Sequence, residues 1–169
     1  MKILKHILYL LFKNYNMVKY CRFRGVKIGE GTKIKSSVNI STEPYLISIG
    51  CNCKITGRVN LITHDGGPWV FRSENPNLDV IKKITIGDNV YVGVGATLMP
   101  GVNIGNNCVI GAQSVVTKDI PSNSVAVGSP ARVIKSLKEY KEKVLSEAYY
   151  TKTLTANKKR KFLEKRLKG

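Results

Sequence analysis

Residues 86–121 read IGDNVY-VGVGAT-LMPGVN-IGNNCV-IGAQSV-VTKDIP, and this stretch decides the fold because its pattern recurs every six residues. Each hexapeptide begins with an aliphatic residue, and glycine follows directly in four of the six. Helices repeat every 3.6 residues and simple strands every 2, so a period of six fits neither. The fifth position is small or aliphatic in every hexapeptide: Val90, Ala96, Val102, Cys108, Ser114 and Ile120.

A period of six fits a prism-shaped coil in which each hexapeptide supplies one short strand and one corner. The leading aliphatic residue points inward, and the fifth residue fills the narrower space near the corner. Glycine and asparagine tolerate strained or left-handed backbone, so Asn89, Asn106 and Asn107 suit the corners. One coil cannot bury its own interior, so stability requires several stacked coils. A looser copy of the repeat runs from Ile28 to Leu61, and we expect the coil domain to span residues 25–134.

The repeat lapses between Leu61 and Ile84, where the chain is rich in glycine, proline, asparagine and aromatic residues. A loop of this length inside a compact repeat domain is usually functional. We therefore expect residues 62–84 to protrude from the prism and to carry chemistry.

The run from Ile86 to Lys135, with the phrases VTKDIP and GSPARVIK, resembles the C-terminal coils of the hexapeptide acetyltransferases. That family includes galactoside, maltose, serine and xenobiotic acetyltransferases. The stretch ITHDGGPWVFR at residues 62–72 resembles the branch that O-acetylates capsular, exopolysaccharide or lipopolysaccharide sugars. The resemblance covers about residues 25–135. It implies a left-handed parallel β-helix, a homotrimer with active sites between subunits, acetyl-CoA as co-substrate and a glycan or sugar as acceptor.

Transfer of an acetyl group requires a base that activates the acceptor, and imidazole suits this task near neutral pH. The chain has two histidines. His6 lies in an apolar, basic segment without polar neighbours, whereas His64 lies where the coil gives way to the loop. The family's catalytic histidine falls at the place of His64, which we therefore expect to be the general base.

The partner that orients the second ring nitrogen of His64 is left open, with Glu43 and Asp65 as the two candidates for this role or for acceptor binding. Trp69, Phe71 and Arg72 can form a wall for a sugar ring. Alternatively, the two aromatic residues only pin the loop to the coil.

The resemblance also implies a coenzyme A groove along the second-half coils. Glycines there would permit close approach of the pantetheine arm, and backbone N–H groups near Gly93 would serve the oxyanion. Tyr91 stands where the family often carries an aromatic residue at the subunit boundary. The implied cofactor contacts are Gly93, Val94, Gly111, Ala112, Thr117, Lys118, Arg132 and Lys135.

The net charge of +17 is concentrated in the two flanking segments, residues 1–24 and 136–169, and no nucleic-acid-binding motif accompanies it. We expect residues 1–24 to form a basic amphipathic helical segment that caps the first coil or lies on an anionic membrane. We expect residues 135–169 to form a basic helical extension. The four cysteines lack metal-ligand spacing, and no secretory signal is evident, so we expect a cytoplasmic protein without a metal, with peripheral contact at the inner membrane face.

Three alternative classes of function differ in how well they fit this pattern. The same base would serve N-acetylation of an amino sugar or O-acetylation of a xenobiotic. A metal enzyme of the γ-carbonic anhydrase type needs three histidines per metal, which one coil histidine cannot supply. A non-catalytic β-helix is the third, and it predicts no binding of coenzyme A.

Overall fold

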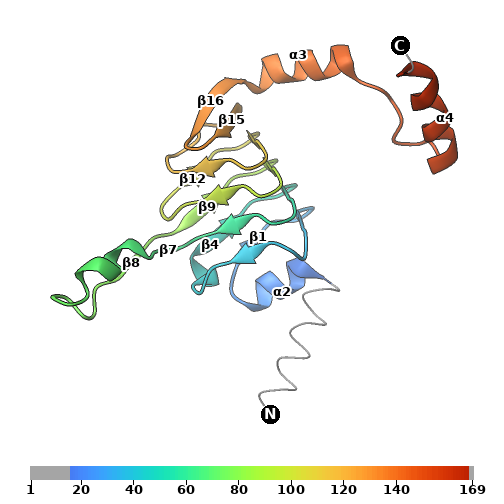
Figure 1. The fold of residues 1–169 in the computed structure, drawn as a ribbon. Helices are drawn as coiled ribbons and strands as arrows, with labels where there is room; N and C mark the ends of the chain where they lie inside the picture. The colour runs from blue at the N-terminus through green and yellow to red at the C-terminus, as the bar shows by residue number, and fades with distance from the viewer. Residues whose placement is uncertain (1–15, 168–169) are drawn as a thin grey trace. The chain divides into compact units, whose positions relative to one another are not determined.

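The computed structural model describes residues 16–167, and in it three parallel sheets form the three faces of a triangular coil (Figure 1). The first face contains β1 (Lys27–Ile28), β4 (Ile47–Ile49), β9 (Ile84–Ile86) and β12 (Asn103–Ile104). The third face contains β3 (Asn39–Ile40), β6 (Asn60–Leu61), β11 (Thr97–Leu98) and β14 (Val115–Val116). The second face contains β2 (Lys33–Ile34), β5 (Lys54–Ile55), β10 (Tyr91–Val92), β13 (Val109–Ile110), β15 (Ser124–Gly128) and β16 (Ala131–Ser136).

Each turn of the coil contributes one strand to each face, and strands pair in parallel with the coil above and below. This is the left-handed parallel β-helix that the repeat and the resemblance predict. The last pair differs, because β16 returns antiparallel to β15 and closes the second face.

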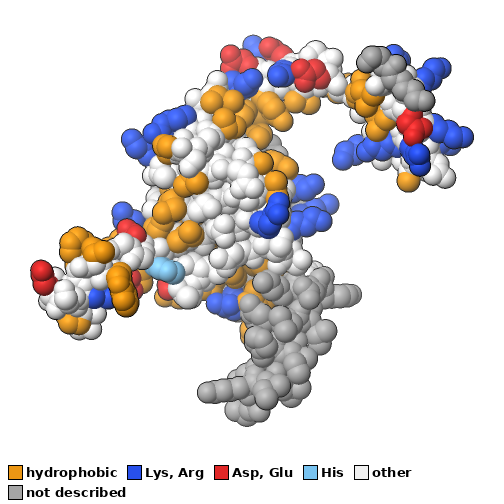
Figure 2. All heavy atoms as spheres, in the orientation of Figure 1, with side chains coloured by type: hydrophobic (Ala, Val, Ile, Leu, Met, Phe, Trp, Pro, Cys, Tyr) orange, Lys and Arg blue, Asp and Glu red, His pale blue; other side chains and the backbone are white. Residues whose placement is uncertain are grey.

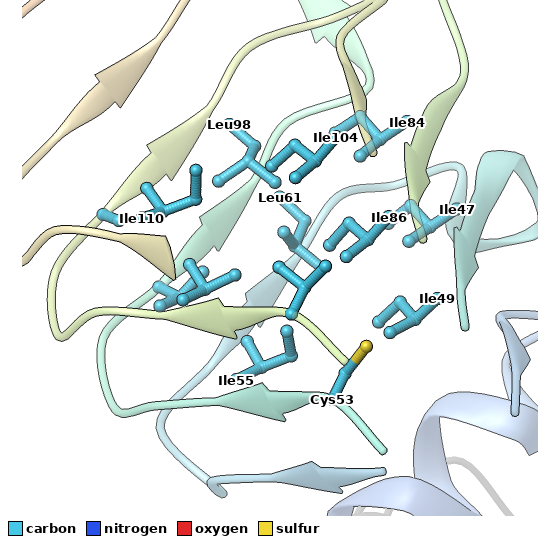
Figure 3. Packing of buried hydrophobic residues seen from close by; sticks show 14 of the residues in the cluster. Ile47, Ile49, Cys53, Ile55, Leu61, Ile84, Ile86, Leu98, Ile104 and Ile110 are labelled. Atoms are coloured by element: carbon cyan, nitrogen blue, oxygen red, sulfur yellow. The ribbon is translucent and has the colours of Figure 1, made fainter. Parts of the chain in front are cut away.

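Aliphatic side chains from successive coils stack inside the prism, as Figure 3 shows for Ile47 and Ile84 and for Ile49 and Ile86. The predicted leading and fifth residues of all six hexapeptides are buried. Ile28, Ile34 and Ile40 of the first coil are only partly buried, because that coil has a neighbour on one side alone. Cys53 and Cys108 fill fifth positions, and burial raises the pKa of both thiols, which favours packing over reactivity.

Asparagine occupies one corner in four successive coils, between the first and second faces. Asn52, Asn89, Asn107 and Asn123 all have φ between 54° and 61° there. The amide of Asn89 donates to Asn107 Oδ1 at 2.8 Å, and Asn107 donates to Asn123 Oδ1 at 3.2 Å. Asn106 lies at the same corner without a left-handed φ, and its Oδ1 accepts the N–H of Asp88 at 2.8 Å.

Helix α2 (Met17–Phe23) packs under the first coil through Met17, Tyr20 and Cys21, which join the hydrophobic core. Asn16 caps it by accepting the N–H of Lys19. This part of the predicted N-terminal segment therefore covers the open end of the prism. The rest of that segment, including His6, lies outside the described residues.

The C-terminal extension begins two residues later than predicted, since β16 continues to Ser136 and α3 (Leu137–Glu147) follows it. Residues from Glu139 onward form a second compact unit, which also contains α4 (Ala156–Arg166). Across residues 16–167, no helix has the length and apolar character that a membrane span requires.

Candidate functional site

The loop leaves the coil as a two-stranded antiparallel hairpin, β7 (His64–Asp65) with β8 (Val80–Ile81). One 3₁₀ helix, η2 (Gly67–Phe71), lies between these strands. Another, η1 (Pro44–Leu46), precedes β4. The hairpin protrudes from the coil in Figure 1, as predicted. The pale blue histidine atoms in Figure 2 lie where this hairpin leaves the coil.

Nδ1 of His64 is surrounded by oxygen atoms from the coil below. Ser41 Oγ lies 3.1 Å from it, Thr42 Oγ1 lies 3.3 Å away and Glu43 Oε2 lies 3.4 Å away. The strand register explains this, because Asn39 and Ile40 pair with Asn60 and Leu61, so residues 41–43 stack beneath residues 62–64.

Glu43 is fixed by two threonine hydroxyls, one on each carboxylate oxygen. Thr42 donates to Oε1 at 2.5 Å, and Thr63 donates to Oε2 at 2.6 Å. These two hydrogen bonds, with a smaller contribution from His64, lower the pKa of Glu43 against the opposing effect of burial. Glu43 is therefore an ionised acceptor beside the imidazole at neutral pH.

Two of the three neighbours of Nδ1 favour the tautomer that carries hydrogen on this atom, and the third, the hydroxyl of Ser41, can accept that hydrogen. The carboxylate of Glu43 can only accept, and the hydroxyl hydrogen of Thr42 is already donated to Glu43. Nε2 then carries the free lone pair, and the His64 side chain is 42% exposed, so solvent or a substrate can reach it. Geometrically, His64 is thus suited to take a proton at Nε2.

Of the two candidate orienting residues, only Glu43 approaches the imidazole. The Asp65 carboxylate instead accepts the N–H of Gly67 at 2.8 Å, across the turn at the start of the loop. Ser41, Thr42 and Thr63 complete the cluster and were not expected from the sequence. The only available signal for them is the register of one coil on the next, which places residues 41–43 under His64.

Trp69 and Arg72 lie together on the protruding loop, with the guanidinium carbon 5.8 Å from the centre of the indole ring. Trp69 is 72% exposed and Phe71 is 56% exposed. Neither ring is buried against the coil of this chain, so the alternative in which they pin the loop is not what the structure shows. Tyr91 lies elsewhere, on the outer side of the second face beside Lys54 and Val109.

The expected cofactor residues fall into two groups on different edges of the prism. We call the corner between the third and first faces the His64 edge; it stacks residues 41–43, 62–64, 99–101 and 117–119. Thr117 and Lys118 therefore lie above His64. We call the corner between the second and third faces the Gly93 edge; it stacks residues 35–37, 56–58, 93–95 and 111–113.

The Gly93 edge carries five of the expected cofactor residues, and the structure does not bring them to His64 within one chain. They are Gly93, Val94, Gly111, Ala112 and, in β16 opposite Val127, Arg132. Lys135 lies further along β16, opposite Val125. The third face separates this edge from the His64 edge.

Gly93 on this edge is required by the packing of one coil on the next. A Cβ on Gly93 would lie 2.5 Å from Ala112 N and 2.6 Å from Gly111 C, which are backbone atoms of the next coil. Coil stacking alone therefore requires glycine here. The N–H of Gly93 donates to Ile110 O at 2.8 Å, so this particular N–H is already used and cannot serve the oxyanion.

Comparisons with known proteins agree with this fold. Residues 83–118 match the family model described as bacterial transferase hexapeptide (six repeats). The chain is 45% identical to Protein CapG of Staphylococcus aureus over 147 residues, which cover 85% of each chain.

Two solved structures share the architecture. The polySia specific acetyltransferase NeuO is 37% identical with a TM-score of 0.58, and the match covers 66% of this chain and 51% of NeuO. A galactoside acetyltransferase in complex with coenzyme A is 26% identical with a TM-score of 0.59, and that match covers 89% of this chain and 85% of the other. The chain thus spans most of CapG but only about half of NeuO.

Proposed function

Because the chain belongs to the hexapeptide-repeat acetyltransferases, we propose that it is an O-acetyltransferase that uses acetyl-CoA. The acceptor is a sugar hydroxyl of a surface polysaccharide or its precursor, and His64 is the general base. The observation that carries this proposal is the cluster around Nδ1 of His64, which holds the ring while Nε2 remains open.

In the proposed reaction, Nε2 of His64 removes the proton of the acceptor hydroxyl as its oxygen attacks the thioester carbonyl. The carbonyl oxygen becomes an oxyanion, which collapses and expels the thiolate of coenzyme A. The imidazolium then returns its proton to that thiolate. Ionised Glu43, close to Nδ1, stabilises the transient imidazolium and keeps the ring oriented.

The proposed coenzyme A site lies between subunits of a homotrimer. A site that needs both the His64 edge and the Gly93 edge cannot form in one chain, because the third face separates them. In a closed threefold assembly, the His64 edge of one subunit can face the Gly93 edge of the next. The solved complex of the related galactoside acetyltransferase with coenzyme A supports the choice of cofactor.

The acceptor class rests on two likenesses. NeuO is described as specific for polySia, a sugar polymer, and the loop sequence from Ile62 to Arg72 resembles that of polysaccharide O-acetyltransferases. The exposed Trp69 with Arg72 above it offers an apolar face and a cation to a sugar ring. We place this activity in the cytoplasm, with contact at the inner face of the membrane.

The test replaces His64 with alanine and measures thiol release from acetyl-CoA with a panel of neutral sugars, acidic sugars and amino sugars. Loss of general-base catalysis should lower turnover by about 10²- to 10⁴-fold. Binding of coenzyme A, followed by calorimetry, should persist, because His64 is not expected to hold the cofactor. Absence of coenzyme A binding in the wild type would favour a non-catalytic β-helix.

A matched control is Glu30→Gln, which changes an exposed carboxylate at a different corner of the first coil. This variant should retain wild-type turnover. Near-wild-type turnover of His64→Ala would refute the role of His64, and turnover of amino sugars alone would move the assignment to N-acetylation.

A further inference from the structure

Helix α4 carries three lysines on one face. Lys158, Lys161 and Lys165 are spaced three and four residues apart, so they align along the helix axis. All three are exposed, and within residues 16–167 none of them makes an ion pair. Basic side chains are prominent over this helix in Figure 2.

Three of the other charged groups of α4 are engaged on the helix, whereas Lys159 is exposed like the lysines of the row. Arg160 and Glu164 form an ion pair at 2.7 Å, and the guanidinium of Arg166 lies 6.0 Å from the centre of the Phe162 ring. Glu164 is the one acidic residue of the helix, and its partner is an arginine rather than a lysine of the row. The row of lysines therefore has no countercharge on the helix itself.

The apolar side of α4 is occupied within the same compact unit. The Phe162 ring meets Tyr149 edge-on, with the centres 5.9 Å apart. Leu154 and Leu163 are half-buried, and Thr151, in the segment before α4, is 8% exposed. Phe162 is four residues after Lys158 and three before Lys165, so this packing borders the lysine row. The three lysine side chains are themselves exposed and remain available to an external partner.

Like charges three and four residues apart weaken a helix, so an uncompensated row is unfavourable for folding. A flat anionic surface would offset this repulsion. The row extends about 10 Å along a straight helix, at 1.5 Å per residue. Lysine is a point charge without the planar fork of arginine, and it suits mobile lipid phosphates better than fixed recognition geometry.

We propose that the lysine row of α4, formed by Lys158, Lys161 and Lys165, docks the enzyme onto an anionic membrane surface. The contact is electrostatic, since the apolar side of the helix is engaged elsewhere in its own unit. This docking goes beyond the proposed transfer reaction and does not depend on it.

The experiment measures co-sedimentation of the full-length protein with phosphatidylcholine vesicles, with and without phosphatidylglycerol. The wild type should bind only the anionic vesicles, and high salt should release it. At about a fivefold contribution per lysine, Lys158→Gln/Lys161→Gln/Lys165→Gln should lower the partition coefficient about a hundredfold. The melting temperature of this variant should be no lower than that of the wild type, because the substitutions remove like-charge repulsion.

The matched control removes the same charge elsewhere through Lys138→Gln/Lys141→Gln/Lys152→Gln, and it should retain most of the binding. Equal partitioning of the two triple variants would overturn the proposal, as would failure of the wild type to bind anionic vesicles. Polyuridylate and polysialic acid serve as soluble polyanions. If either polymer binds the lysine row at concentrations where vesicles do not bind, the partner is a polymer and the membrane proposal is wrong.

Discussion

Glu43 is an ionised carboxylate with a threonine hydroxyl on each oxygen, and at the scale of single residues this predicts a pH-dependent stability. Its pKa is lowered in the folded state, so the free energy of unfolding gains a contribution that is fully present above the ordinary glutamate pKa, about 4.3. That contribution disappears as the pH falls through the folded-state pKa. We expect Glu43→Gln to lower the free energy of unfolding by about 1 kcal/mol at neutral pH, and by progressively less below about pH 4.

Thermal unfolding of both proteins between neutral and acid pH measures this difference. Glu30→Gln, at an exposed carboxylate, provides the reference for any general effect of charge. A gap between wild type and Glu43→Gln that widens toward acid pH would show that Glu43 is protonated in the folded protein.

The position of His64 was predictable from sequence, because it is the one histidine at the break in the repeat. The cluster that holds it was predictable only in part. Glu43 could be named because it lies one coil earlier, but Ser41, Thr42 and Thr63 carry no signal until the register is known. A looser first coil with an irregular link leaves that register open by a residue or two, and one residue changes which face a side chain occupies.

At the scale of elements, the corner glycines show that coil stacking can require a residue for which the sequence suggested a ligand-binding role. The sequence suggested that Gly93 admits a ligand, whereas the structure places the backbone of the next coil against it. We expect Gly93→Ala to lower the free energy of unfolding by about 1–3 kcal/mol, because neighbouring backbone cannot move aside as a side chain can. Chemical or thermal unfolding measures the loss.

Gly66→Ala is the matched control for this substitution. Gly66 lies at the start of the protruding loop with φ of −80°, and nothing lies within 4 Å of the Cβ that alanine would add. Its stability should stay within about 0.5 kcal/mol of wild type. If Gly93→Ala instead kept full stability but lost affinity for coenzyme A, the ligand-approach explanation would be restored.

At the scale of the whole molecule, the fold was predictable because a strict period of six is compatible with few structures, and every coil shows the same residue pattern. The division of the candidate site between two edges was not predictable in this way. The position of a residue within its hexapeptide predicts whether it lies inside the prism or at a corner. Which corners stack on the same edge depends on how many residues each turn of the coil contains. The inserted loop and the link at residues 41–46 change that number.

The two edges lead to a test of the assembly by mixing inactive chains. His64→Ala removes the base from the His64 edge, and Ala112→Arg fills the Gly93 edge with a long side chain. Each variant alone should form an inactive trimer. If every site combines the His64 edge of one subunit with the Gly93 edge of the next, about a quarter of the sites in randomly mixed trimers join two intact edges.

Co-expression of the two variants, followed by thiol release from acetyl-CoA, should therefore recover about a quarter of wild-type turnover. Mixing the purified homotrimers without exchange of subunits is the control and should recover none. A site contained in one chain predicts no recovery under either condition, because every chain then carries its own lesion. Full activity of Ala112→Arg alone would exclude the Gly93 edge from the site, since no obstruction there could then matter.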